Sequence, residues 1–136
     1  MKIREYKAED HEALCCFWLE SGIGLDSTDS AEELAKAQLL NPGLFLIAES
    51  EEGTICGSVL GLFNGRRRWI NHLAVSPLHR KQGIARKLLA ELEKRLISRG
   101  CPQLNLHILP SNSGVSEFYE KVGYLRKEVI YMAKRL

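Results

Sequence analysis

Residues 73–90 read LAVSPLHRKQGIARKLLA: an apolar strand end, a basic turn that contains Gly83, and then an amphipathic helix. Gly83 has no Cβ, so the backbone can come close to a ligand at this point. The N–H groups of the first helical turn have no intrahelical acceptors and carry a partial positive charge, which suits an anion. The segment therefore predicts a cradle for a diphosphate. Five of its side chains add charge of the same sign: His79, Arg80, Lys81, Arg86 and Lys87.

Within this segment, Arg80-x-x-Gly83-x-Ala85 resembles the acetyl-CoA signature of the GNAT superfamily of N-acetyltransferases. A strand before the turn and a helix after it are the context that such a signature needs. A Gly-x-Gly-x-x-Gly pattern and the Gly-Lys-Ser/Thr ending of a P-loop are both absent. The resemblance implies that six residues hold the pyrophosphate through their backbone N–H groups: Lys81, Gln82, Gly83, Ile84, Ala85 and Arg86.

Length and composition predict one compact domain over residues 1–136. The hydrophobic fraction of 45% and the charged fraction of 26% are those of an ordinary globular protein. No apolar run approaches the roughly 20 residues of a membrane span, and Met1–Glu5 contains no apolar signal core, so we expect a cytoplasmic protein without a membrane partner. A formal net charge of +2 is too small for general nucleic-acid binding.

The four cysteines form no C-x-x-C pair and have no histidine at a metal-ligand spacing. They predict reduced, mostly buried thiols. Neither they nor any cluster of His, Asp and Glu indicates a metal site.

Hydrophobic periodicity and turn signals predict the order of the elements. An opening strand at Ile3 and Tyr6 is followed by one helix that starts at Asp10 and a second that starts at the capping box Ser30-x-x-Glu33. Strands at 44–49, 54–63 and 67–75 form an antiparallel meander, whose last hairpin is Asn64-Gly65. After the helix that follows Gly83 come a strand at 103–109, a short helix at 115–122 and closing strands within 124–134.

This order is similar to that of a GNAT domain over nearly the whole chain. The resemblance implies an α/β fold with a mixed central sheet of six to seven strands and about four flanking helices. It also implies that the strand ending at Leu73, Ala74 and Val75 splays from residues 104–108 and binds pantetheine through its free backbone groups. The side chains of Leu73 and Val75 can belong to the core at the same time.

Asn112 and Tyr119 match the Asn and Tyr that the family places near the pantetheine and the thioester sulfur. A tyrosine hydroxyl can protonate a departing thiolate. However, Tyr119 also lies on an apolar helical face beside Phe118, where many tyrosines only pack. Asn112 can equally cap its helix.

The general base has two candidates. Many family members carry a Glu on the strand that leads to Leu73, but here that strand reads Trp69-Ile70-Asn71-His72. Alignment of the Asn112 and Tyr119 segment with ribosomal-protein N-terminal acetyltransferases puts His107 where those enzymes have a Glu. His72 and His107 are therefore the candidate bases, acting directly or through water, although a strand histidine more often only packs.

The acceptor is expected to be a primary amine of a protein N-terminus or a small molecule. Without a carboxylate base an amine of low pKa is favoured, since deprotonation at neutral pH costs about 4 to 5 kcal/mol for a lysine and about 1 kcal/mol for an α-amine. Asp26 and Asp29, in the loop from Gly22 to Asp29, could attract a cationic amine, although helix capping explains Asp29 equally well.

The sequence thus predicts an acetyl-CoA-dependent N-acetyltransferase in which the amine attacks directly in a ternary complex. The alternative is a catalytically silent acetyl-CoA sensor or interaction module of the same fold. A nucleic-acid-binding protein that uses Arg66, Arg67 and Arg68 is a further rival; these arginines are otherwise a solvated hairpin tip or an anion contact. Oligomeric state is left open, a homodimer included.

Overall fold

The computed structural model describes residues 1–110 and 114–136 in full, and residues 111–113 by their backbone only. Asn112 therefore lies outside the described side chains. The chain forms two compact units, residues 1–106 and residues 107–136. The prediction of one domain over residues 1–136 stays a prediction.

The first unit is built on an antiparallel sheet of four strands in the order β1-β2-β3-β4. The strands are β1 (Lys2–Glu5), β2 (Phe45–Glu49), β3 (Ile55–Phe63) and β4 (Arg68–Val75). The predicted meander is confirmed, and so is its last hairpin. The side chain of Asn64 accepts hydrogen bonds from the backbone N–H groups of Arg66 and Arg67 and closes that turn.

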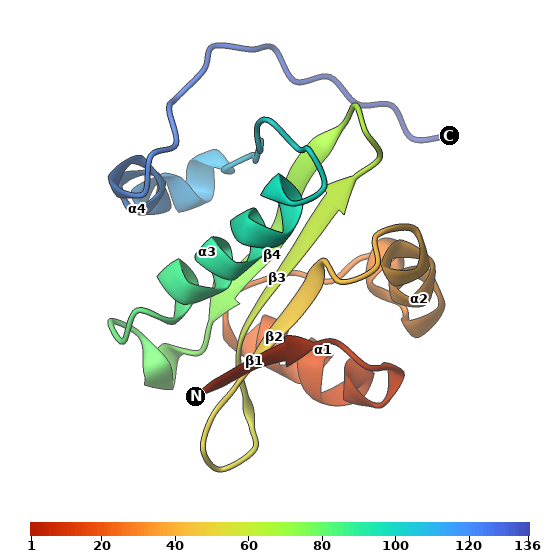
Figure 1. Cartoon of the computed structure of the whole chain (residues 1–136), viewed down its shortest axis with the longest axis vertical. Coiled ribbons are helices and arrows are strands. Elements are labelled where there is room, and N and C mark those ends of the chain that lie inside the picture. Colours follow the sequence, from red (N-terminus) through yellow and green to blue (C-terminus); the bar gives the residue numbers. More distant parts are fainter. The chain divides into compact units, whose positions relative to one another are not determined.

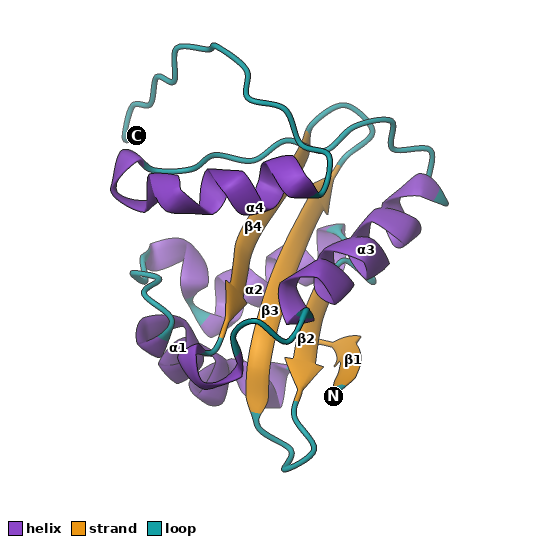
Figure 2. Ribbon diagram, turned by 90° about the vertical axis from the view of Figure 1, so that its left-hand side faces the viewer, coloured by secondary structure: helices purple, strands orange, loops and turns teal.

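Three helices cover the two faces of this sheet (Figures 1 and 2). They are α1 (His11–Glu20), α2 (Ala31–Leu40) and α3 (Ile84–Ile97). Leu60 of β3 packs in the core that contains the α1 side chains, whereas its neighbour Gly61 faces Leu92 of α3. Because successive strand residues point to opposite faces, α1 and α3 lie on opposite sides of the sheet.

The core on the α1 side is aromatic. Trp18 is fully buried, and its ring lies nearly parallel to that of Phe45, with the centroids 6.3 Å apart. Phe45 stacks in turn on Tyr6 at 4.4 Å. Leu14, Phe17 and Trp18 are the buried residues of α1, as the sequence predicts.

The second unit contains a 3₁₀ helix (Pro110–Val115) and the short helix α4 (Ser116–Lys121). The ring of Tyr119 meets the rings of Phe118 and Tyr124 edge-on, at centroid distances of 5.3 and 5.7 Å. Tyr119 therefore packs on a half-buried aromatic face, as expected from its position in the sequence.

The predicted sheet of six to seven strands is wrong: the sheet has four, all antiparallel. Of the strand predicted at 103–109, Asn105 pairs with Trp69 of β4 in an isolated parallel bridge. Residues 124–134 form no strand in the part of the chain that the structure describes. Val129, Ile130, Tyr131 and Met132 are at least 70% exposed, whereas successive side chains of a strand with one covered face alternate between buried and exposed.

Among the described residues, no helix combines the length and the apolar character that crossing a bilayer requires.

The packing of α3 against β3 yields a stability prediction. A Cβ at Gly57 would lie 2.8 Å from Cγ2 of Ile84 and 2.9 Å from Cδ1 of Leu88, and both side chains are buried. Gly57→Ala should therefore lower the free energy of unfolding by about 1 to 3 kcal/mol in urea denaturation, because overpacking forces α3 to shift. Gly24→Ala is the matched control, since a Cβ there meets nothing within 4 Å. Equal stability of the two variants would contradict this packing.

Candidate functional site

Strand β4 carries a bulge in the middle of its pairing with β3. Leu60 pairs with Asn71 and Ser58 pairs with Ala74, so two residues, His72 and Leu73, face the single residue between Ser58 and Leu60. The backbone of His72 has φ +52°, in the left-handed region that a side chain disfavours. A bulge of this kind turns a side chain toward a new neighbour and interrupts strand pairing.

Buried hydrogen bonds hold the bulge in place. The indole Nε1–H of Trp18 donates to Ser58 Oγ at 2.8 Å, and Ser58 Oγ donates to the carbonyl oxygen of His72 at 2.9 Å. Ser58 is fully buried, so these bonds compete with no solvent. They tie β4 to β3 and α1 where the ladder is interrupted.

The ring of His72 contacts a buried carboxylate. Its Nε2 lies 2.8 Å from Oδ1 of Asp29, and the side chain of Asp29 is only 6% exposed. The ring also meets Trp18 edge-on, with the centroids 4.6 Å apart. The imidazole is thus fixed by α1 on one side and by the connection between α1 and α2 on the other.

That connection contains a 3₁₀ turn, Ser27–Asp29, with a reciprocal cap. Asp26 Oδ1 accepts from the Thr28 N–H at 2.7 Å, and Asp29 Oδ2 accepts from the Asp26 N–H at 3.0 Å. Both oxygens of Asp29 are therefore engaged inside the protein, in keeping with the capping alternative for Asp29. Asp26 stays exposed, and hydrogen bonds from Thr28 lower the pKa of its carboxyl group.

The outer edge of β4 is open beyond its first residues. The bridge at Trp69 consists of two hydrogen bonds, from Ile70 N–H to Asn105 O at 2.9 Å and from Asn105 N–H to Arg68 O at 3.0 Å. Beyond Ile70, no further pairing on this edge occurs within the described chain. The outward backbone groups of residues 73–75 are consequently free to bind an amide-containing chain.

The N-terminus of α3 is open as well. Gly83 caps the helix with φ +77°, and a Cβ there would meet nothing within 4 Å. Glycine is thus required by the backbone angle and not by crowding, and the space in front of the helix is clear. Across the described residues, no acceptor contacts the N–H groups of residues 81–86, while Lys87 N–H donates to Gly83 O and continues the helix.

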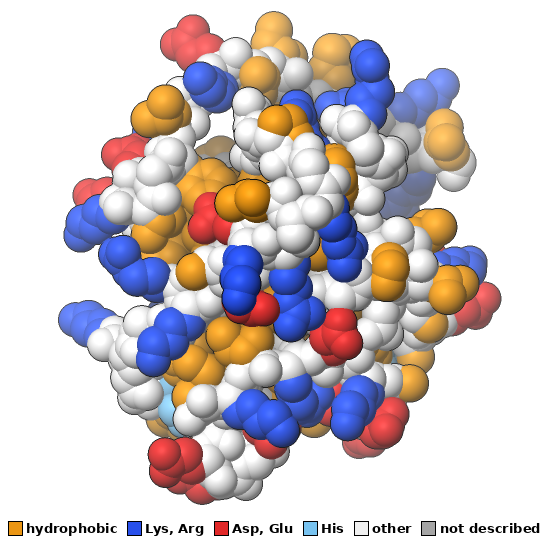
Figure 3. Space-filling view, viewed as in Figure 1, with side chains coloured by type: hydrophobic (Ala, Val, Ile, Leu, Met, Phe, Trp, Pro, Cys, Tyr) orange, Lys and Arg blue, Asp and Glu red, His pale blue; other side chains and the backbone are white. Residues whose placement is uncertain are grey.

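Two non-glycine residues of the described chain have positive φ. His72 lies at the bulge of β4, and Lys81 lies in the turn just before α3. Such backbone conformations cost of order 1 to 3 kcal/mol and persist where the surroundings impose them, commonly at functional sites. Both belong to the first unit. Figure 3 shows Lys and Arg side chains spread over one face, with Asp and Glu side chains among them.

The other candidates belong to the second unit. Burial raises the pKa of Tyr119 to about 12. His107 is exposed, and its ring meets that of Tyr131 edge-on at 4.8 Å. Both side chains therefore pack against aromatic rings of the second unit.

The four cysteines are free thiols: Cys56 and Cys101 are buried, Cys15 is half-buried and Cys16 is exposed. Burial raises the pKa of Cys15 and of Cys56, which lowers their nucleophilic fraction at neutral pH. Within the described residues no group of three or more His, Cys, Asp or Glu side chains could hold a metal ion.

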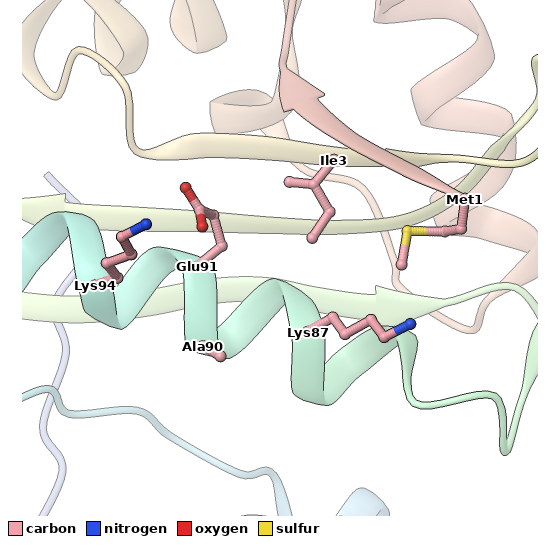
Figure 4. Close-up of a pocket in the computed structure, with 6 residues that line it drawn as sticks. All are labelled: Met1, Ile3, Lys87, Ala90, Glu91 and Lys94. Carbon is pink, nitrogen blue, oxygen red and sulfur yellow. The ribbon is translucent and has the colours of Figure 1, made fainter.

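Two shallow hollows lie away from the bulge. One, of about 470 Å³, runs between β1 and α3 and includes Ile3, Lys87 and Glu91 in its lining (Figure 4). It borders β1, the sheet edge opposite β4. The other, of about 640 Å³, is lined by Gly65 and the three arginines 66–68. The Nε of Arg68 is buried and has no hydrogen-bond partner among the described residues.

The sequence of this chain is similar to those of known proteins. The family model described as "Acetyltransferase (GNAT) family" matches residues 7–124. The chain belongs to the GNAT family of acetyltransferases. An acetyltransferase of Yersinia pestis is 37% identical over 136 residues, which is 100% of this chain and 96% of that protein. An acetyltransferase of Pectobacterium atrosepticum is also 37% identical over the same shares.

Solved structures share the fold of this GNAT protein. The PaiA N-acetyltransferase of Thermoplasma acidophilum in complex with coenzyme A has a TM-score of 0.82 at 24% identity, covering 95% of this chain and 92% of that one. Naa20 of Chaetomium thermophilum in complex with a bisubstrate analogue has a TM-score of 0.80 at 21% identity, covering 90% and 70%.

Acetyl-CoA is the acetyl donor of the family, and the residues of this GNAT protein fit it. The clear space at Gly83 and the unpaired N–H groups of residues 81–86 suit a diphosphate. The open backbone edge at residues 73–75 suits a chain that contains amides.

Two glycines that flank α3, Gly83 before it and Gly100 after it, allow a matched test of the cradle. Gly83 and Gly100 have φ +77° and +78°, and a Cβ at either would meet nothing within 4 Å. Valine at either position therefore imposes the same backbone strain, but only Gly83 precedes the open N–H groups. Acetyl-CoA at about 100 times its dissociation constant adds about 2.7 kcal/mol of stability, which is several degrees in Tm. We expect Gly83→Val to lose this shift and Gly100→Val to keep it; loss or retention in both would refute the cradle.

Proposed function

We propose that this GNAT acetyltransferase transfers the acetyl group of acetyl-CoA to a primary amine, by direct attack in a ternary complex. The acceptor would be a protein N-terminus or a small-molecule amine. The observation that carries the proposal is His72, a constrained imidazole at the bulge of β4, next in sequence to the open strand edge at residues 73–75.

The binding roles follow the free backbone groups of the first unit. The N–H groups of residues 81–86, with the Arg80 side chain, would hold the diphosphate. Leu73, Ala74 and Val75 would hold the pantetheine amides through their outward backbone. Asn112 keeps the pantetheine role that the family resemblance implies.

His72 is favoured over His107 as the general base. Its ring is fixed by Asp29 and Trp18, and proton transfer needs a base held in one orientation. Asp26 is exposed in the same loop as Asp29, and hydrogen bonds from Thr28 lower the pKa of its carboxyl group. Asp26 would attract the acceptor ammonium. His72 would then take a proton from that amine. Acetyl-CoA, when bound, supplies the activated thioester that the free amine attacks.

Tyr119 would act on the leaving side. With a pKa of about 12 it keeps its proton at every physiological pH. A thiol has a pKa near 8.5, so a thiolate is a weaker base than the phenolate of Tyr119. We therefore assign Tyr119 the role of donating a hydrogen bond to the departing sulfur, with final protonation from solvent.

A thiol-release assay with acetyl-CoA and a panel of amines tests this function. The panel holds N-terminal peptides, peptides acetylated at the N-terminus with one free lysine, and small aliphatic amines. We expect release of CoA with α-amines to exceed release with lysine at pH 7, because the α-amine is easier to deprotonate. Acetyl-CoA binding without thiol release from any amine would favour the sensor alternative.

Tyr119→Phe removes the hydroxyl and keeps the ring contacts with Phe118 and Tyr124. We expect kcat to fall about 10²-fold, as when one donor to a developing charge is lost, with little change in acetyl-CoA affinity. Because a pKa of about 12 keeps the donor protonated, the ratio of wild-type to variant kcat should stay constant from pH 7 to 10.

Tyr131→Phe, in the same unit and 70% exposed, is the matched control and should keep full activity. Equal turnover in Tyr119→Phe would remove Tyr119 from the mechanism. A ratio that declines between pH 8 and 10 would show a hydroxyl that ionises too early for this role.

A further inference from the structure

We infer that Asp29 is a positioning residue that fixes the tautomer of His72, so that Nδ1 carries the lone pair that accepts the proton of the amine. This inference rests on the proposed function for its catalytic consequence. The contact itself does not depend on that function, because it exists in the protein without substrate.

The hydrogen-bond network assigns the tautomer. Ionised Asp29 can only accept hydrogen bonds: Oδ2 accepts from the Asp26 N–H, and Oδ1 lies 2.8 Å from His72 Nε2. Nε2 must therefore carry the hydrogen, and in the neutral ring the lone pair falls on Nδ1. No other hydrogen bond to the His72 ring occurs among the described residues.

Asp29 is itself held by its surroundings. Its carbonyl oxygen lies 2.9 Å from Nε2 of His11, which supports the backbone of Asp29 from α1. Its carboxylate is 6% exposed, whereas the side chain of His72 is 27% exposed. The orienting carboxylate is thus shielded from water, and the ring that it orients remains accessible to an amine.

The backbone of His72 is constrained from a third direction. Ser58 binds its carbonyl oxygen and Trp18 packs edge-on against its ring. A residue at φ +52° stays in that conformation because these contacts impose it. Rotation of the ring away from Asp29 would break the hydrogen bond between the two side chains, so the direction of Nδ1 is set as well as its protonation.

The step is one proton transfer. A proton leaves the acceptor amine nitrogen and binds Nδ1 of His72, which gives an imidazolium next to the Asp29 carboxylate and a neutral amine with a free electron pair. The imidazolium later loses the proton from Nδ1 to water, which restores the starting tautomer.

Asp29→Asn reverses this arrangement for a geometric reason. The Asp26 N–H needs an acceptor, so the single carbonyl oxygen of the new amide must face Asp26. The NH₂ group then faces His72 and donates to Nε2. The ring must move its hydrogen to Nδ1, where it can no longer accept a proton from the amine.

The experiment combines nitrogen-15 NMR of the full chain labelled at histidine with steady-state kinetics. In the wild type we expect the His72 ring to be the Nε2–H tautomer, with its resonance assigned from the spectrum of His72→Gln. In Asp29→Asn we expect the Nδ1–H tautomer, a fall in kcat of about 10²- to 10⁴-fold and an unchanged KM for acetyl-CoA.

Ser30→Ala is the matched control for the loop. Ser30 Oγ caps α2 by accepting from the Glu33 N–H at 3.2 Å, and its loss destabilises the same connection without a contact to His72. This variant should keep both the tautomer and kcat. If Ser30→Ala lowers kcat as much as Asp29→Asn does, the role of Asp29 is structural and the inference is wrong.

The wild-type spectrum alone can overturn the inference, even if Asp29→Asn fails to fold: an Nδ1–H tautomer or an equal mixture excludes positioning by Asp29. Inversion of the tautomer with unchanged kcat would equally overturn it. A wild-type protein that releases no thiol with any amine would refute the proposed function, while the NMR result would still decide whether Asp29 fixes the ring.

Discussion

The interrupted pairing of β4 with β3 is the constraint on which the rest of the site depends. Two residues, His72 and Leu73, occupy the space opposite one residue of β3. This surplus turns the His72 ring toward Asp29 and leaves the following strand edge without a partner strand. A continuous ladder would have given neither a directed imidazole nor an open row of backbone groups. The hydrogen bonds from Trp18 to Ser58 and from Ser58 to the His72 carbonyl oxygen stabilise this bulge.

The position of α3 follows from the same sheet. Gly57 and Gly61 have no side chain on the face of β3 that α3 covers, and buried leucines of the helix occupy the space there. Only eight residues separate the end of β4 from the start of α3, so this packing also fixes the N-terminus of the helix near the end of the open strand edge. An edge that offers amide partners and a helix end that offers N–H groups are thus consequences of one packing arrangement. Together they suit the two chemically different parts of coenzyme A.

In the proposed function, the carboxylate that orients His72 comes from outside the strand that carries this histidine. The strand segment Trp69–His72 contains no acidic residue, which by itself argues for a weak base. The fold supplies a carboxylate from the connection between α1 and α2, 43 residues away. Because both carboxylate oxygens of Asp29 are engaged inside the protein, we propose Asp26 as the carboxylate of that loop that attracts a cationic acceptor.

Local patterns in the sequence determined the elements of the first unit, the helix at 116–121 and the start of α3 after Gly83, because periodicity, caps and turns act over a few neighbouring residues. They overestimated the sheet, since the strand propensity of residues 103–109 and 124–134 says nothing about whether a partner strand is present. Only the tertiary structure decided the bulge at His72 and its contact with Asp29. Both depend on register and on loop placement between distant segments, and in the sequence helix capping explained Asp29 as well as a contact with a cationic amine did.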